Sequence, residues 1–454
     1  MMVIKMRSIK EINEFIDANL NKVNEQYRLK FHMMPPVGWM NDPNGLVFFK
    51  DNYHICYQYN PFNSLPGTMH WGQFVSKDLI KYEDVGVVIA PTKEHTSIFS
   101  GGAIEIDGEV NAVYTLHYEH EGVKREEVYL SKSKDGINFT DFGCVFDNET
   151  LPKNICREDF RDPCPVKIND TYYVFIGAKD VEINQGLVVV LKGDNLEHLT
   201  YDFTIGPFYE LGDMGECPSY FRVDGKDVIL ASGCRVKQQN NNYKNENSSV
   251  FIVGDVDFIN KKFELDFVKE IDKGDVFYAP QFIRGLEEPV MVGWLEMWGK
   301  PYPTHNQNHG WTGALSIPRK LEIKNNDIYQ IPVATLEKYY KKYQTDSNTF
   351  DITFEIEPGG ELVVSGGKYA VRIGLDEQVY LNTMDSNNEN GCIRKTNETY
   401  SKCIVRALFD TSSVEVFVEG GKEVISSRIY LDKEYQLTHD ANVKIISLYE
   451  IGVD

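Results

Sequence analysis

Three carboxylate residues, Asp42, Asp162 and Glu216, each stand in a short polar motif of the chain. Two carboxyl groups at the bottom of an aromatic-lined pocket are enough to hydrolyse a glycosidic bond, one as the nucleophile and the other as the general acid. The acid must keep its proton near neutral pH, and burial beside other carboxylates raises a pKa in that direction. Glu216 suits the acid role because no cation is adjacent to it, whereas Arg161 is expected to keep its neighbour Asp162 ionised.

Taken singly, each of these residues is more often a turn or surface residue. The run Asp42-Pro43-Asn44-Gly45 has the composition of an ordinary turn, because Pro43 fixes φ and Asn-Gly reverses the chain. Repetition along the chain indicates that these residues share one site. Five polar motifs follow one another at intervals of 54 to 62 residues, and their lead residues are Asp42, Ser100, Asp162, Glu216 and Tyr278. A fixed interval of this kind indicates repeated supersecondary units.

Each motif leads into a predicted β-hairpin, and the repeated hairpins suggest how the motifs meet. Apolar, alternating segments flank turns at Lys50-Asp51-Asn52, Asp107-Gly108, Asn169-Asp170 and Asp224-Gly225, and a fifth pair runs from Phe282-Ile283 to Val290–Trp294. Four strands per unit are typical of a propeller blade, so five repeats predict five blades around a central channel. The motif that starts each innermost strand would then face the channel.

The rest of the chain predicts three further segments. Ser8 and Glu11 match a capping box before helical spacing from Ile9 to about Asn24. Clean alternation beyond Thr345 predicts an antiparallel sandwich. The fold class is therefore all-β, with an N-terminal helical extension at residues 1–28, a five-bladed β-propeller at 29–330, a linker helix at 331–344 and a β-sandwich at 345–454.

Composition excludes several classes of partner. The net charge of −21, with 68 acidic residues, argues against binding nucleic acid or an anionic membrane. Eight cysteines without a Cys-x-x-Cys pair suggest neither a zinc site nor a disulfide framework. Met1–Arg7 lacks the apolar core of a secretory signal, so a cytoplasmic location is expected. His305 and His309 have i, i+4 spacing in a loop, and no metal is expected there.

The motifs also occur together, in a fixed order, in one known family. They are Trp39-Met40-Asn41-Asp42-Pro43-Asn44-Gly45, Tyr57-Gln58-Tyr59-Asn60-Pro61, Phe99-Ser100-Gly101-Gly102, Phe160-Arg161-Asp162-Pro163, Glu216-Cys217-Pro218, Phe277-Tyr278-Ala279-Pro280-Gln281 and Gly293-Trp294. From about Tyr27 to the C-terminus the chain resembles glycoside hydrolase family 32, the β-fructofuranosidases. The resemblance implies a five-bladed propeller with a β-sandwich, a retaining mechanism, a small-molecule sugar as substrate, and neither a cofactor nor a metal.

The resemblance also implies roles for individual residues. Asp42 would be the nucleophile, Glu216 the general acid and base, and Asp162 a stabiliser of the transition state. A retaining mechanism would place the carboxyl groups of Asp42 and Glu216 roughly 5–5.5 Å apart. Residues that match fructose-binding positions are Asn41, Gln58, Trp71, Phe99, Ser100, Arg161, Tyr278 and Trp294. Trp71 and Trp294 could equally be core residues, and Gln58 a turn residue with satisfied hydrogen bonds.

Within the family, the chain looks most like sucrose-6-phosphate hydrolases and intracellular sucrases. It departs from many relatives at Leu65-Pro66-Gly67, Gly215 and Ser219, which puts the binding site of the leaving group in doubt. Arg235, Lys237, Lys244 and Lys300 are candidates for holding a phosphate on that group. The alternatives are an exo-hydrolase of fructans or fructo-oligosaccharides, a fructosyltransferase, and a carbohydrate-binding propeller without catalysis. The sequence does not indicate an oligomeric state.

Overall fold

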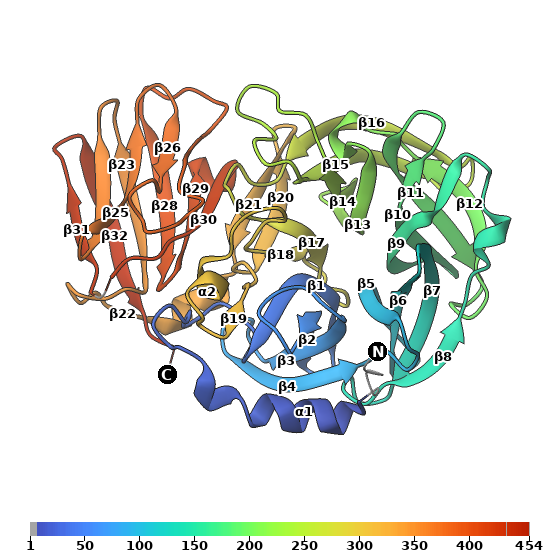
Figure 1. Ribbon diagram of the computed structural model, residues 1–454. Helices are drawn as coiled ribbons and strands as arrows, with labels where there is room; N and C mark the ends of the chain where they lie inside the picture. Colours follow the sequence, from blue (N-terminus) through green and yellow to red (C-terminus); the bar gives the residue numbers. More distant parts are fainter. Residues whose placement is uncertain (1–6, 433, 454) are drawn as a thin grey trace.

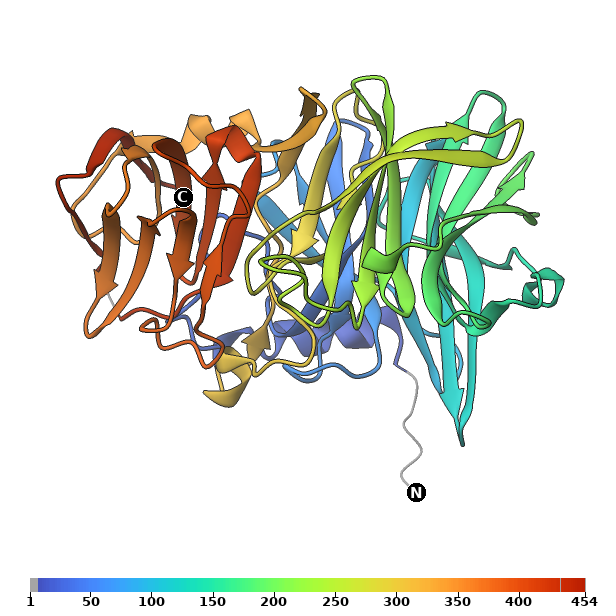
Figure 2. The same cartoon turned by 90° about the horizontal axis from the view of Figure 1, so that it is seen from above.

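The computed structural model describes residues 7–432 and 434–453, and these form two β units that lie side by side (Figures 1 and 2). Five sheets surround a common axis in the first unit, and two sheets face each other in the second. The predicted all-β fold, a five-bladed β-propeller followed by a β-sandwich, is therefore confirmed. Residues 1–6, which cover most of the segment expected to lack a secretory signal, lie outside the described part of the chain.

Blade 1 carries Asp42 on its innermost strand. Its hairpin turn places Lys50 and Asp51 at φ of 50° and 59°, the left-handed values that tight hairpin turns use. A short late strand, β19 (Trp311–Thr312), pairs in parallel with the start of the blade, so hydrogen bonds join the end of the propeller to its beginning. From the axis outward the strands are β1 (Gly38–Phe49), β2 (Asn52–Asn60), β3 (His70–Ser76) and β4 (Tyr82–Ile89).

The other four blades repeat this outward order, and the five predicted hairpins are confirmed as the first two strands of each blade. Blade 2 consists of β5 (Thr96–Ile106), β6 (Glu109–His120), β7 (Val123–Ser133) and β8 (Thr140–Cys144). Blade 3 consists of β9 (Ile155–Ile168), β10 (Thr171–Asp180), β11 (Gln185–Gly193) and β12 (Thr200–Ile205). Blade 4 consists of β13 (Met214–Val223), β14 (Lys226–Cys234), β15 (Ser248–Asp257) and β16 (Lys262–Glu270). Blade 5 consists of β17 (Tyr278–Phe282), β18 (Val290–Trp294), β20 (Arg319–Lys324) and β21 (Asp327–Pro332).

Helices are few, and the first is shorter than predicted. The helix α1 (Ile9–Asp17) has the expected capping box at Ser8 and lies along the outer strand of blade 1 (Figure 1). It ends before Asn24 because the amide of Asn19 donates to the carbonyl of Phe15 at 2.7 Å and competes with the helical hydrogen bond. No helix in residues 7–432 and 434–453 is long and apolar enough to cross a bilayer. The remaining helical turns are η1 (Leu20–Lys22), η2 (Asn148–Thr150), η3 (Tyr209–Leu211), α2 (Pro303–Asn306), η4 (Ala334–Tyr339) and η5 (Glu419–Gly421).

The sandwich begins earlier than predicted. The linker helix expected over 331–344 is the shorter 3-10 helix η4, and the next three residues form a strand of the sandwich, where Tyr340 stacks on Tyr449 at 4.6 Å. One sheet contains β22 (Tyr340–Lys342), β32 (Val443–Ile451), β23 (Phe350–Ile356), β28 (Cys403–Asp410), β29 (Ser413–Val418) and β30 (Glu423–Arg428). The other contains β27 (Ile393–Lys395), β26 (Val379–Asn382), β25 (Tyr369–Leu375), β24 (Glu361–Gly366) and β31 (Gln436–His439).

A buried network of charges joins the two units. Nδ1 and Nε2 of His32 lie 2.8 Å from carboxylate oxygens of Asp410 and Glu415, respectively. Burial alone would lower the pKa of His32, but these two hydrogen bonds raise it to about 9, so the ring is charged at neutral pH. Arg319 of blade 5 donates to Glu415 of the sandwich and, at 3.0 Å, to Asp272. Every one of these groups is buried, so each charge depends on its partners.

Replacing Arg319 by methionine should destabilise the protein strongly. The substitution leaves Glu415 and Asp272 buried with one partner fewer, a change that typically costs about 3–5 kcal/mol. The midpoint of urea unfolding would measure the loss. Arg372→Met is the control, because Arg372 and its partner Asp385 are much more exposed and such pairs contribute little. Equal midpoints for the two variants would contradict the role assigned to the junction.

Candidate active site

A β-bulge interrupts the innermost strand of every blade at its polar motif. The register with the second strand breaks between Met40 and Pro43, Ile98 and Gly101, Arg161 and Cys164, Glu216 and Ser219, and Tyr278 and Gln281. Proline cannot donate to a ladder and glycine adopts unusual φ values, so a central strand tolerates either residue mainly at a bulge. The residues that mark the bulges are Pro43, Gly101, Pro163, Pro218 and Pro280.

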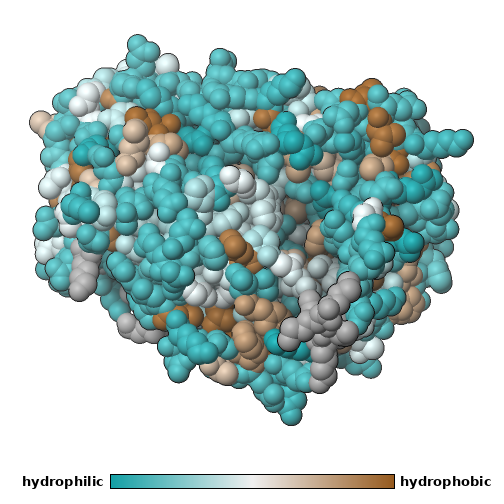
Figure 3. Space-filling view, viewed as in Figure 1, coloured by the Kyte–Doolittle hydropathy of each residue, from teal (hydrophilic) through white to brown (hydrophobic). Residues whose placement is uncertain are grey.

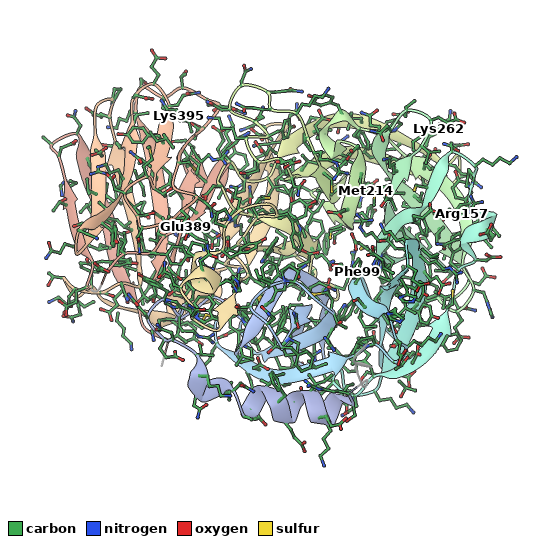
Figure 4. The ribbon with its side chains drawn as sticks, in the orientation of Figure 1. Phe99, Arg157, Met214, Lys262, Glu389 and Lys395 are labelled. Carbon is green, nitrogen blue, oxygen red and sulfur yellow. The ribbon has the colours of Figure 1, made fainter. Side chains whose placement is uncertain are left out.

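The bulges turn the motifs toward the propeller axis. Asp162, Cys217 and Ala279 take φ of 65°, 46° and 51°, which are left-handed values that a regular strand does not contain. The face of the molecule above these strand ends is hollowed (Figure 3), and Phe99 and Met214 lie beside the centre of the propeller (Figure 4). The expected convergence of the motifs is confirmed by hydrogen bonds between them, such as that from Ser100 to Asp42 and that from Cys217 to Asp162.

Two of the predicted carboxylates meet at one thiol: the sulfur of Cys217 lies 3.4 Å from Oδ2 of Asp162 and 3.7 Å from Oδ2 of Asp42. The third, Glu216, lies close enough for its charge to raise the pKa of both aspartates. The hydroxyl of Ser100 donates to Oδ2 of Asp42 at 2.9 Å. The backbone N–H of Cys217 donates to Asp162 at the same distance. Asp42 and Asp162 are buried, whereas the side chain of Glu216 keeps 16% of its surface exposed.

The position of Arg161 corrects the electrostatic prediction. Its guanidinium does not bind the carboxylate of Asp162; Nε and Nη2 both donate to Oε1 of Glu216, at 3.1 and 2.6 Å. Arg161 still acts on Asp162 through its charge, but its hydrogen bonds are made to Glu216. The other oxygen of Glu216 accepts a hydrogen bond from the hydroxyl of Tyr278 at 2.6 Å.

The pKa shifts follow these contacts. Burial and the charge of Glu216 raise the pKa of Asp42 to about 6. Burial also raises the pKa of Asp162 to about 7; the charge of Arg161 opposes this shift, and the charges of Glu216 and Asp42 add to it. Burial alone would raise the pKa of Glu216, but Arg161 and Tyr278 lower it below its ordinary value. Asp162 is therefore the most readily protonated of the three carboxylates, and the prediction that Arg161 keeps Asp162 ionised is wrong because burial outweighs the charge of Arg161.

One residue of the site was missed by the sequence reasoning. Glu126 on β7 is buried, and its carboxylate accepts from Nη1 of Arg161 at 3.1 Å and from Nδ1 of His117 at 3.3 Å. The ring of His117 stacks on Phe99 at 4.1 Å, and thus supports one wall of the hollow. No motif or turn marks Glu126; the available signal was a charged residue at an inward position of an alternating strand.

The remaining predicted binding residues form two groups, one beside Cys217 and one behind the bulge of β5. Tyr278 and Trp294 belong, with Cys217, to an aromatic cluster around Trp39, whose indole N–H donates to Oδ1 of Asn41 at 2.7 Å. The indole N–H of Trp294 makes no hydrogen bond to the described residues. Two residues lie one layer further back and hold the β5 bulge. Gln58 donates to the carbonyl of Ile98 and Trp71 to that of Phe99, both at 3.0 Å.

The histidines and phosphate candidates lie in other surroundings. His305 is within 2.8 Å of the Ser64 hydroxyl, and His309 stacks on Tyr27 at 5.2 Å. Among the described residues, no group of His, Cys, Asp and Glu is arranged to hold a metal. Two of the four predicted phosphate candidates already have protein partners. Arg235 donates to Asp213 at 2.8 Å, and Lys300 donates to the carbonyl of Asp275 at 2.6 Å.

Comparison with known proteins identifies the family of the chain. Residues 32–332 match the glycosyl hydrolases family 32 N-terminal domain, and residues 327–450 match the family 32 C-terminal domain. A sucrose-6-phosphate hydrolase of Escherichia coli is 31% identical over 435 residues, covering 89% of each chain. A raffinose invertase of the same species is 30% identical, covering 88% of this chain and 89% of its own. A Bombyx mori β-fructofuranosidase, solved with sucrose bound, is 28% identical and superposes with a TM-score of 0.87 over 98% of both chains.

Asp162→Asn should stabilise the protein, and more so at alkaline pH. A folded-state pKa near 7, above the usual value of about 4, means that the contribution of Asp162 to stability is largest below about pH 4, is lost as the pH rises from about 4 to about 7, and then stays constant. Asparagine carries no such charge. The melting temperature of the variant should exceed that of wild type by a few degrees at pH 8, with a smaller difference at pH 5. Asp51→Asn, at an exposed turn, is the control; a pH-independent effect of Asp162→Asn would contradict the raised pKa.

Proposed function

Because the chain belongs to glycoside hydrolase family 32, we propose that the carboxylates on the propeller axis are its catalytic residues. The protein is a glycoside hydrolase of the invertase type, a β-fructofuranosidase that hydrolyses sucrose or sucrose-6-phosphate. One observation carries the proposed site. Asp42 and Asp162, which come from different blades, both lie within 4 Å of the thiol that follows Glu216.

Asp42 is proposed as the nucleophile. Its Oδ2 accepts a hydrogen bond from Ser100, which orients the carboxylate. Attack by this carboxylate on the anomeric carbon of the fructosyl unit forms one C–O bond while the glycosidic C–O bond breaks. The product of this step is a covalent fructosyl-enzyme and a free leaving sugar.

Glu216 is proposed as the general acid and base. Its side chain keeps 16% of its surface exposed, which suits a group that must give a proton to the leaving oxygen. In the free enzyme Arg161 favours its ionised form, so the acid role requires that substrate binding raise the pKa of Glu216. Fructose hydroxyls that donate to Asp162 stabilise its ionised form, and exclusion of water raises the pKa of Glu216. In the second step Glu216 takes a proton from the water that releases fructose.

The substrate-binding residues remain the eight predicted from the sequence, and two supports can be given for them. The indole N–H of Trp294 is buried and has no hydrogen-bond partner in the described part of the chain, so its donor is free for a substrate oxygen. Phe99 presents the ring that His117 backs. The cytoplasmic location is also kept as a proposal; none of the eight cysteines, all of which lie in the described residues, forms a disulfide.

Asp42→Asn and Glu216→Gln should each lower kcat by at least about a thousandfold, because each removes a group that takes part in bond making. The loss should appear with both sucrose and sucrose-6-phosphate, since the same carboxylates serve either substrate. Release of fructose would be measured by a coupled assay. Asp51→Asn, in the exposed β1–β2 turn, should retain wild-type activity. Wild-type turnover by either catalytic variant would refute its assigned role.

The value of kcat/KM should fall on the acid side at a pH that is unusually high for an aspartate nucleophile. Asp42 must be ionised to attack, and its pKa in the free protein is raised to about 6. The value of kcat/KM reports the free enzyme. It should therefore fall as the pH drops below about 6, when Asp42 becomes protonated. A profile that stays flat down to pH 4.5 would show that the surroundings do not raise the pKa of Asp42.

A further inference from the structure

Arg161 is shared between two carboxylates that have different surroundings. Its Nε and Nη2 donate to Glu216, while its Nη1 donates to Oε2 and Oε1 of Glu126 at 3.1 and 3.4 Å. A further contact of 3.3 Å joins Nη1 to Oδ1 of Asp159. The side chain of Asp159 keeps 31% of its surface exposed, whereas that of Glu126 is fully buried. Water therefore screens the charge of Asp159 much more than that of Glu126.

The carboxylate of Glu126 is itself fixed from several directions. The backbone N–H of Phe160 donates to its Oε2 at 3.0 Å, next to the arginine in the chain. His117 lies 3.3 Å away, and the ammonium group of Lys124 lies 3.2 Å away. Burial alone would raise the pKa of Glu126, but Arg161, His117 and Lys124 lower it, so the group is ionised at neutral pH. A fixed anion thus holds one end of the guanidinium.

We propose that Glu126 is a positioning residue that holds Arg161 against Glu216 and limits how much of its positive charge acts on the three carboxyl groups. This inference rests on the proposed function of Asp42, Asp162 and Glu216. An arginine without a second anion would hold Glu216 ionised and unable to donate a proton. With Glu126 at its other end, Arg161 forms a nearly neutral pair that can orient Glu216 and still allow it to be protonated.

The titratable groups that face Arg161 and its two carboxylate partners come from seven strands. On β9 and β13 they are Asp159, Asp162, Glu216 and Cys217, and on β1 the group is Asp42. On β6 and β7 they are His117 and Lys124, on β14 the thiol of Cys234, and on β17 the hydroxyl of Tyr278. Glu126 itself is a buried carboxylate that is not one of the three proposed catalytic residues.

Glu126→Gln should move the basic limb of the kcat/KM profile to lower pH by about half a unit or more. The variant keeps the size of the side chain but removes a negative charge, so Arg161 attracts the ionised carboxylates more strongly and the shared proton is lost at lower pH. Glu126→Asp keeps the charge one methylene group further back. The basic limb of the kcat/KM profile of Glu126→Asp should stay near its wild-type pH, even if kcat falls. Both profiles would be measured with sucrose on folded protein, checked by thermal unfolding.

Glu127→Gln is the matched control, because Glu127 is the next residue on β7 and its half-exposed side chain lies on the other face of the strand. Its limb should not move. A lower kcat for Glu126→Gln with an unmoved limb would overturn the proposal and leave Glu126 a purely structural residue. An equal shift in Glu127→Gln would also overturn it, as an effect of net charge alone. Failure of the proposed function would look different, since Asp42→Asn would then remain active.

Discussion

Three carboxylates gathered on one axis, two of them buried and the third paired with Arg161, are the constraint on which the rest of the structure depends. Asp42 and Asp162 expose less than a tenth of their surface, and like charges so placed repel strongly. The repulsion helps to raise the pKa of Asp42 and Asp162, and Arg161 offsets part of it. In the proposed mechanism the same raised pKa values would keep a proton available near the reacting bond.

Such a site requires strand ends that cannot move apart. The parallel pairing of β19 with β1 closes the ring of blades, so no blade can splay outward without breaking hydrogen bonds. On the side of blades 1 and 5, the charges of His32, Arg319, Asp410 and Glu415 join the propeller to the sandwich. The sandwich thus contributes to the site through rigidity, although no residue of it was assigned to the chemistry.

The bulges are the local device that aims the functional groups. A regular strand would direct every second side chain into a blade interface, where a carboxylate would have no partner. One extra residue at each motif re-aims the side chains toward the axis, and proline or glycine makes the interruption possible in a central strand. The composition of the motifs, with Asp-Pro, Cys-Pro and Ala-Pro pairs, therefore has a backbone cause as well as a chemical one.

The sequence by itself determined the repeat, the five hairpins, the sandwich and the convergence of the motifs, because alternation and turn residues act over a few neighbours and a fixed interval implies stacked units. It could not determine which charges are paired. Arg161 and Asp162 are adjacent in the chain, yet the guanidinium contacts Glu216, which is 55 residues away. The local signal of Glu126 was weak, since it is only a charged residue at an inward position of an alternating strand. Pairing depends on distances across blades, and tertiary structure alone decides those; for the same reason it decides which carboxylate has the raised pKa.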